Sequence, residues 1–244
     1  MAELESVRSF LKTVSYEEKH CECLNLEKGR NPFITISREA GAGGHSLALA
    51  VMKELSQRKE PYFQGWAVFD QEICKMLAED PELNVTIQGL LTMEYRSQIQ
   101  DTIEELALGT SPQHTVLKKM FEVIRTLASF GKVILVGRGA SFLTRELPLG
   151  IHLRLTAPLP VRIKRMMQLL NLDEKKAKEI IQNQDKARAA LIKNFFNKDI
   201  SDPLMYDAVW NTGSVPLETI ARAAVQMAAD RKCHCQQPDL MIPS

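Results

Sequence analysis

The sequence predicts an α/β fold in which a five-stranded parallel sheet lies between layers of helices. Five strand-length runs of β-branched, aromatic or leucine residues are spaced along the chain, and helical patterns separate them. The chain has 244 residues and is 45% hydrophobic, enough for the core of one sizeable α/β domain. A glycine cluster follows the first run, at the point where such folds often bind anions.

The expected strands are Phe33–Ser37, Trp66–Asp70, Val133–Gly137, Ile151–Leu155 and Asp207–Asn211. Their alternation with helical segments is typical of a parallel sheet covered on both faces. The third run is apolar throughout, which predicts a central buried strand. The fourth run alternates, so we expect one of its faces to meet polar groups.

Segments outside the strands divide the chain into three parts. Residues 3–19 have apolar side chains at helical spacing and predict an amphipathic helix, after which a linker carries glycine and proline. The expected parts are an N-terminal helix and linker at 1–30, a main domain at 31–230 and a C-terminal tail at 231–244. Two long helical insertions, 71–130 and 158–200, follow strands, where ligands are usually held.

Composition limits the classes of partner. The net charge is +1, which favours neither nucleic acid nor acidic membranes, and no run approaches the roughly 18 apolar residues of a membrane span. The N-terminus lacks a secretory signal pattern, and five cysteines do not indicate a disulfide scaffold. We therefore expect a cytoplasmic protein. A homodimer is the assembly considered for it.

The glycine cluster predicts a phosphate-binding loop. It comprises Arg38, Glu39, Ala40, Gly41, Ala42, Gly43, Gly44, His45 and Ser46. Glycines allow the backbone to approach a ligand closely, and the unpaired amides of the following helix favour an anion. A tight turn from strand to helix is the alternative interpretation.

The loop departs from the usual pattern G-x-x-x-x-G-K-S/T. When Gly43 is aligned with the last glycine, Arg38 stands at the first glycine and Gly44 at the lysine. The cation that grips the β- and γ-phosphates is therefore absent from its usual place. Arg38, His45 or an arginine from another segment is expected to replace it, because a guanidinium binds phosphate well.

Five segments in order resemble the cytidylate kinase-like family, a divergent branch of the P-loop nucleoside monophosphate kinases. They are "ITISREAGAGG", "VFDQEI", "VILVGRGASFL", "HLRLTAPLPVRIKRMM" and "DKARAA…YDAVWNTG", within roughly residues 33–228. The resemblance implies a three-layer P-loop NTPase fold with a helical monophosphate-binding insertion and a lid that carries arginines. It also implies that the protein uses ATP and Mg²⁺ to phosphorylate a small acceptor such as CMP.

The resemblance assigns two residues to acceptor binding. Asp70 resembles the aspartate that opens the monophosphate-binding segment, and Arg138 resembles the arginine of the family's G-R-D segment. Their alternative roles are a helix N-cap and a salt-bridge partner. Val136 and Gly139 replace aspartates that flank this arginine in cytidylate kinases, so an acceptor for the cytosine amino group is missing there.

The resemblance also implies a lid. Arg162, Arg165 and Arg188 correspond to the lid arginines that act on the triphosphate, and Asp185 to a residue that contacts the acceptor. A solvated basic face and an ordinary intrahelical ion pair are the alternatives. Ile181 stands where a further lid arginine is expected, which predicts a weaker clamp.

Two further features leave alternatives open. The segment "WNTG", which ends at Gly213, matches a loop that flanks adenine in the family, although a simple strand-ending turn fits equally. The clusters "HCEC" at 20–23 and "CHC" at 233–235 contain zinc-binding residue types. Their spacing is tighter than usual, so ordinary surface thiols without a metal are expected.

The residues therefore predict two classes of function. The first is an ATP-dependent phosphotransferase for a nucleoside monophosphate or another small acceptor. The second is a nucleotide-binding sensor or scaffold that has lost catalysis, which the missing lysine and Ile181 favour. The glycine cluster and the lid arginines favour an enzyme.

Overall fold

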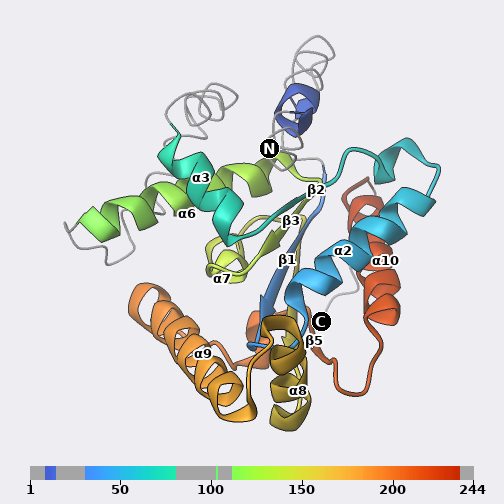
Figure 1. The fold of residues 1–244 in the computed structure, drawn as a ribbon. Helices are drawn as coiled ribbons and strands as arrows, with labels where there is room; N and C mark the ends of the chain where they lie inside the picture. Colours follow the sequence, from blue (N-terminus) through green and yellow to red (C-terminus); the bar gives the residue numbers. More distant parts are fainter. Residues whose placement is uncertain (1–8, 15–30, 81–102, 104–111, 237–244) are drawn as a thin grey trace.

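A parallel sheet of five strands runs through the centre of the protein, with helices on both sides (Figure 1). The computed structural model describes residues 9–14, 31–80, 103 and 112–236. The strands are β1 (Phe33–Arg38), β2 (Ala67–Phe69), β3 (Val133–Val136), β4 (Gly150–Thr156) and β5 (Ala208–Asn211). Their order is β2-β3-β1-β4-β5, and every neighbouring pair is parallel. The predicted sheet is confirmed, with β3 buried along its whole length.

Three groups of helices surround the sheet. The helices are α2 (Gly44–Gln57), α3 (Gln71–Glu79), α6 (Pro112–Phe130), α7 (Ala140–Leu143), α8 (Leu159–Leu170), α9 (Glu174–Phe196) and α10 (Leu217–Gln236), with 3₁₀ turns at Pro61–Phe63 and Pro203–Met205. Helices α2 and α10 pack together on one face, and α3 and α6 lie on the other. Helices α8 and α9 lie beyond the carboxyl ends of the strands (Figure 1).

The alternation of side chains along β1 divides the core between the two faces. Ile34 and Ile36 are fully buried in the cluster beneath α2 and α10, whereas Phe33 belongs to the cluster beneath α3 and α6. Burial of each such side chain stabilises the fold by roughly 1.5–3 kcal/mol. The central strand is therefore anchored on both sides, and its carboxyl end holds the glycine loop in a fixed place.

The N-terminal segment contributes to the same core. Residues 9–14 are helical, and Phe10 packs edge-on against Phe69 of β2 with ring centroids 5.3 Å apart. Leu11 and Val14 are also buried there. The remainder of the helix predicted at 3–19 lies outside the described residues.

One face of β4 carries buried polar side chains, as its alternating sequence predicts. The ring of His152 is 5% exposed, and its Nδ1 lies 2.9 Å from the hydroxyl of Thr35. Its backbone N–H donates to the Asp207 carboxylate at 2.7 Å. Arg154, two residues further along β4, donates to the Ser37 hydroxyl at 2.9 Å. The Thr35 hydroxyl also lies 2.8 Å from the Ser141 hydroxyl of α7, so polar groups connect β1, β4 and α7 beneath the carboxyl end of the sheet.

We expect protonation of His152 to make stability depend on pH. Burial lowers the pKa of His152 from 6.5 to about 4, with Asp207 opposing this shift and Arg145 and Arg231 adding to it. The unfolded chain therefore takes up this proton first, and the free energy of unfolding falls as pH drops from about 6.5 to about 4. Urea unfolding at pH 7 and pH 5 should show a smaller loss for His152→Gln than for the wild type. Parallel losses in the two proteins would contradict this assignment.

Candidate active site

The glycine loop begins where β1 ends and leads directly into α2. Gly41 and Gly43 have φ of 77° and 89°, values that residues with a side chain rarely adopt. The first hydrogen bond of α2 runs from Leu47 N–H to the Gly43 carbonyl at 2.8 Å. The amides of His45 and Ser46 precede that bond, so they have no partner within the helix, and both side chains are exposed. The loop is a tight turn, and its geometry is also that of an anion cradle.

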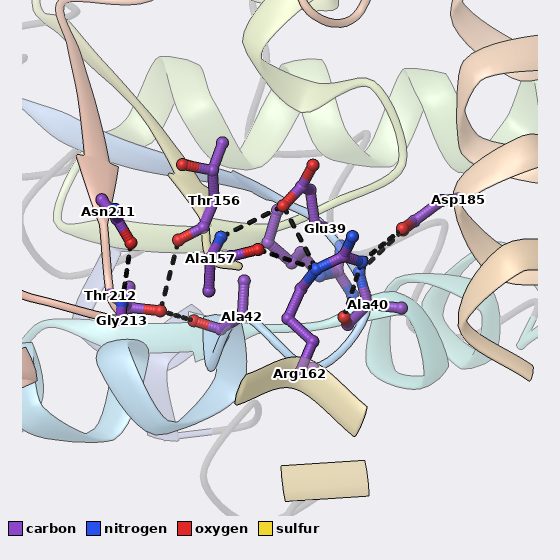
Figure 2. Close-up of polar contacts among 12 residues, drawn as sticks. Glu39, Ala40, Ala42, Thr156, Ala157, Arg162, Asp185, Asn211, Thr212 and Gly213 are labelled. Atoms are coloured by element: carbon purple, nitrogen blue, oxygen red, sulfur yellow. Dashed lines mark hydrogen bonds and ion pairs between the residues drawn. The ribbon is translucent and has the colours of Figure 1, made fainter. Parts of the chain in front are cut away.

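Arg162 of α8 holds the loop in place from below (Figure 2). Its guanidinium donates to the carbonyls of Ala157 at 3.0 Å and Ala40 at 3.2 Å. It also pairs with Glu39 at 3.4 Å and with Asp185 at 2.6 Å. Arg162 is 9% exposed, so the alternative of a solvated basic face is wrong for this residue. Its charge is neutralised by two carboxylates of the protein.

Asp185 of α9 binds the loop directly. Its Oδ1 accepts a hydrogen bond from the Ala40 N–H at 2.7 Å, and its Oδ2 accepts the one from Arg162. A carboxylate oxygen on a loop amide resembles the contact that a phosphate oxygen makes at such loops. The role predicted for Asp185 toward an acceptor is untested, because both of its oxygens are engaged by the protein itself.

The turn after β5 closes the other side of the loop. The Thr212 hydroxyl donates to the Ala42 carbonyl at 2.9 Å (Figure 2). Arg165 donates to the Thr212 hydroxyl at 2.8 Å and to its carbonyl at 2.7 Å. The Asn211 side chain accepts from the Gly213 N–H at 2.9 Å, which makes this segment a strand-ending turn. Arg165 therefore reinforces the loop, and contact of this turn with adenine remains a prediction.

Ile181 has a structural role that explains why no arginine stands there. It is 1% exposed and packs with Ala40, Ile163, Met166 and Ala177 in an apolar cluster between α8, α9 and the loop. The lid of this protein is therefore attached to the loop by apolar packing as well as by Asp185.

We expect Ile181→Arg to destabilise the protein by about 3 kcal/mol, because it places an unpaired charge in the apolar cluster. The neighbouring substitution Gln182→Arg is a matched control, since Gln182 is exposed on the same helix. Urea unfolding of both variants measures the difference. Equal stability of the two would show that α9 packs loosely on the loop.

The Arg38 side chain crosses the loop between two glycines. A Cβ on Gly44 would lie 2.9 Å from the Arg38 Cγ, and a Cβ on Gly137 would overlap the Arg38 Nη1. Both glycines therefore leave room for this guanidinium. A lysine at position 44 would collide with it, which accounts for the departure from the usual loop pattern.

The charge of Arg38 is weakly compensated. Burial lowers the pKa of Arg38 to about 10, Arg188 and Arg138 add to the shift, and Asp70 opposes it. Arg38 therefore stays protonated at neutral pH. No partner within the described part of the chain forms an ion pair or hydrogen bond with its guanidinium.

Arg138 and Arg188 bring two further cations to the same place. Arg138 follows β3 with φ of 53°, and its Nε is buried without a hydrogen-bond partner among the described residues. Burial lowers its pKa, as it does that of Arg188. Arg188 is 3.5 Å from the Asp185 carboxylate and 3.1 Å from the Gln184 side-chain oxygen, so the predicted intrahelical ion pair is present.

These arginines line a pocket of about 290 Å³ beside the glycine loop. Its polar lining residues are Arg38, Arg138, Arg188, Gln71, Gln184, Ser37 and Ser141. No aspartate or glutamate of the described chain lines it. A half-enclosed pocket with this excess of positive charge is suited to a multiply charged anion such as a phosphate monoester.

Asp70 lies at the edge of this group as the N-cap of α3. Its Oδ1 accepts from the backbone N–H groups of Glu72 at 3.0 Å and Ile73 at 3.1 Å, which confirms the N-cap alternative. It does not line the pocket. Contact with an acceptor remains a prediction for the second carboxylate oxygen.

Sequence reasoning missed the pocket residues Ser37, Ser141 and Gln71. The signal for Ser37 was available, because β1 alternates between apolar residues and Thr35 and Ser37. Such hydroxyls on a buried strand indicate polar partners on the facing strand.

The prediction on metal binding concerns the two terminal cysteine clusters, whose side chains lie outside the described part of the chain. Residues 20–23 and the side chains of 233–235 are not among the described residues. Within the described part of the chain, no group of histidine, cysteine and acidic side chains is arranged to hold a metal ion. None of the described helices combines the length and apolar character of a membrane span.

The parallel sheet, whose central strand passes through a glycine loop into α2, defines a kinase-like P-loop fold. A solved structure of an uncharacterized protein from Eubacterium ventriosum has the same fold. It aligns with a TM-score of 0.63 at 20% identity, over 82% of this chain and 99% of the other.

The chain belongs to the cytidylate kinase-like family, whose model matches residues 33–214. Two relatives named cytidylate kinase are similar to it. The one from Methanosarcina barkeri is 27% identical over an alignment of 186 positions that covers 73% of this chain and 88% of the relative. The one from Methanocaldococcus jannaschii is 26% identical over 152 residues, or 61% and 84%.

Proposed function

We propose that the protein transfers the γ-phosphoryl of ATP to a small acceptor that carries a phosphate, with a nucleoside monophosphate such as CMP as the first candidate. One observation carries the proposal. Arg38, Arg138 and Arg188 converge on a pocket beside the glycine loop, and none of the described residues that line this pocket is a carboxylate. In phosphoryl transfer the protein mainly positions the reactants and neutralises charge, and this arrangement suits both tasks.

The loop residues fit the phosphates of ATP. The positive φ of Gly41 and Gly43 supports this assignment, as do the helix-terminal amides of Gly44, His45 and Ser46. The Ser/Thr whose hydroxyl binds Mg²⁺ in the usual pattern aligns with His45, so the exposed Ser46 hydroxyl, one residue further in the first turn of α2, is the nearest candidate for that role. Bound Mg²⁺ would neutralise charge on the phosphates. Ala42 contributes its backbone, since its side chain is buried.

We assign the lid arginines to two roles. Arg188 reaches the pocket and is the candidate catalytic residue, with Arg38 in place of the missing lysine. Arg162 and Arg165 donate to loop carbonyls and to Thr212, so we assign them to shaping the loop. Arg138 would bind the phosphate of the acceptor, because its Nε has no partner among the described residues.

The relatives and the pocket lining support the choice of the acceptor to test first. Both similar curated proteins are cytidylate kinases, which makes CMP the first acceptor to test. The pocket offers amide and hydroxyl groups from Gln71, Gln184, Ser37 and Ser141 in place of a carboxylate. We therefore expect weaker discrimination between cytosine and uracil than a carboxylate would give.

A nucleotide-binding sensor without transferase activity is the second candidate. The observation in its favour is that Asp185 and Arg162 bind the loop and each other, so groups of the protein itself attach the lid to the loop. Such a protein would bind nucleotide and change its lid without turnover.

Binding is the first test of the proposal. We expect ATP with Mg²⁺ to raise the melting temperature, and CMP to raise it further. A ligand at one hundred times its Kd stabilises the folded state by about 2.7 kcal/mol. The screen should include UMP, AMP, GMP and GTP. Absence of a shift with every nucleotide at millimolar concentration would overturn the proposed function.

A further inference from the structure

A chain of hydrogen bonds runs beneath the pocket from β4 to the segment before β5. Arg154 Nη1 donates to the Ser37 hydroxyl at 2.9 Å, and that hydroxyl lies 3.2 Å from the hydroxyl of Tyr206. The Tyr206 hydroxyl donates to the Ile200 carbonyl at 2.8 Å. Ser37 and Arg154 are neighbours in the register of β1 and β4, so the sheet itself sets their separation.

The two ends of this chain of hydrogen bonds fix its direction, because Arg154 can only donate and the Ile200 carbonyl can only accept. A guanidinium can only donate, so the Ser37 oxygen accepts from Arg154. The single phenolic proton of Tyr206 goes to the Ile200 carbonyl, which is the shorter contact. The Ser37 proton is therefore donated to Tyr206. The Ser37 oxygen therefore has one lone pair that no group of the described chain uses. Because Ser37 lines the pocket, this lone pair can accept a hydrogen bond from a bound molecule.

We propose that Ser37 determines specificity by accepting a hydrogen bond from an N–H or O–H group of the acceptor molecule, and that Arg154 and Tyr206 position it for that task. The inference rests on the proposed function, since it concerns the same pocket. A polar group that is built to pair with a substrate donor discriminates against analogues that lack the donor.

A structural role alone accounts poorly for Arg154. It is 6% exposed and forms no ion pair with a carboxylate of the described chain, and Asp199, whose side chain is exposed, is the carboxylate that interacts with its charge from a greater distance. Its guanidinium lies 5.6 Å from the Tyr206 ring centroid, and its charge adds to the repulsion around Arg188. Burying a cation with so little compensation weakens a fold. Its presence is better explained by the orientation it imposes on Ser37 and by the charge it adds beside the pocket.

The direction of the bonds can be tested without any ligand, by the titration of Tyr206. Burial raises the pKa of Tyr206, and the hydrogen bond from Ser37 lowers it. Ser37→Ala should therefore move the titration of Tyr206 to higher pH. If Tyr206 were the donor to Ser37, the same change would move the titration to lower pH. NMR of ring-labelled tyrosine follows the titration, and Tyr206→Phe identifies its signal. A shift to lower pH, or none, overturns the proposal.

Specificity is tested with two matched pairs of ligands. CMP and its analogue with hydrogen in place of the 4-amino group differ by an amino donor, and CMP and dCMP differ by the 2′-hydroxyl donor. In at least one pair we expect the wild type to bind the donor-bearing member about fivefold more tightly, the factor that one hydrogen bond supplies. Ser37→Ala should reduce the ratio of the two affinities within that pair to about one, because it weakens the binding of the donor-bearing member alone. Ser56→Ala, which removes an exposed hydroxyl near the carboxyl end of α2 that does not line the pocket, should leave the ratio unchanged.

The roles of Arg154 and Tyr206 in positioning Ser37 are tested by the same ratio of affinities. Tyr206→Phe should lower it, because the Ser37 proton is then free to turn into the pocket. Arg154→Met should lower it as well, whereas Arg154→Lys keeps a donor and should preserve it. Equal binding within both pairs by the wild type, or an unchanged ratio in Ser37→Ala, overturns the proposal. If no monophosphate binds the wild type, the proposed function fails, and the titration of Tyr206 alone decides the direction of the bonds.

Discussion

Replacing Arg38 by methionine is expected to lower kcat for phosphoryl transfer by about a thousandfold, the lower end of what one arginine contributes in other phosphoryl-transfer proteins. The guanidinium is held between Gly44 and Gly137 and is the cation closest to the place of the absent loop lysine. Methionine preserves much of the volume and removes the charge. Because charge develops in the transition state, kcat should fall far more than ATP affinity.

The same substitution should not destabilise the protein. Arg38 is buried near Arg138 and Arg188, so its removal relieves desolvation and like-charge repulsion. We expect the melting temperature of Arg38→Met to equal or exceed that of the wild type. Arg222→Met, on the exposed side of α10, is the matched control and should leave kcat unchanged. Wild-type turnover in Arg38→Met would show that another group replaces the lysine.

Gly43→Val is expected to abolish stabilisation by ATP while the protein remains folded. Gly43 has φ of 89°, a conformation that a β-branched residue resists, and the loop backbone should move away from the phosphates. Space is not the obstacle, because a Cβ at this position would be 3.5 Å from the nearest atom of Leu217. The strain costs of order 1–3 kcal/mol, less than the stability of a typical domain.

The matched control for this variant is Gly65→Val. Gly65 also has a positive φ, 79°, but lies in the loop before β2, away from the site. Thermal shift with ATP and Mg²⁺ compares the two variants. A normal ATP shift in Gly43→Val would show that the glycine cluster serves only as a turn.

The fold could be predicted from sequence because its signals are local. Each strand is a short apolar run, and Asp70 and Asp173 occupy N-cap positions where their side chains accept from the first turn. The strand β2 is shorter than expected at its carboxyl end because Asp70 leaves it to cap α3. Positive φ at Gly41 and Gly43 likewise follows from residue type.

The partners of the site residues could not be predicted in the same way. Arg162 and Arg165 have the same residue type and lie on the same helix, yet one pairs with two carboxylates and the other with Thr212. Their partners come from segments far apart in the chain, so only the packing of α8 against the loop selects them. The position of Arg38 depends on Gly137, which is 99 residues away in the sequence.

At Ile181 the sequence and the structure give complementary information about the lid. The sequence indicates a missing lid arginine and hence a weaker clamp. The structure shows the apolar cluster that this residue completes, so the lid is attached to the loop by packing. Whether this attachment is compatible with turnover distinguishes an enzyme from a sensor.

Turnover tests the central claim most directly. ADP release should be measured for the wild type and Arg188→Ala with ATP, Mg²⁺ and a panel of CMP, UMP, AMP, GMP and their deoxy forms. We predict release above the no-acceptor control for at least one monophosphate, and a fall in kcat of about a thousandfold in Arg188→Ala with ATP affinity nearly retained. A wild-type rate that no monophosphate raises above the control would contradict the account and indicate a nucleotide-binding protein without transferase activity.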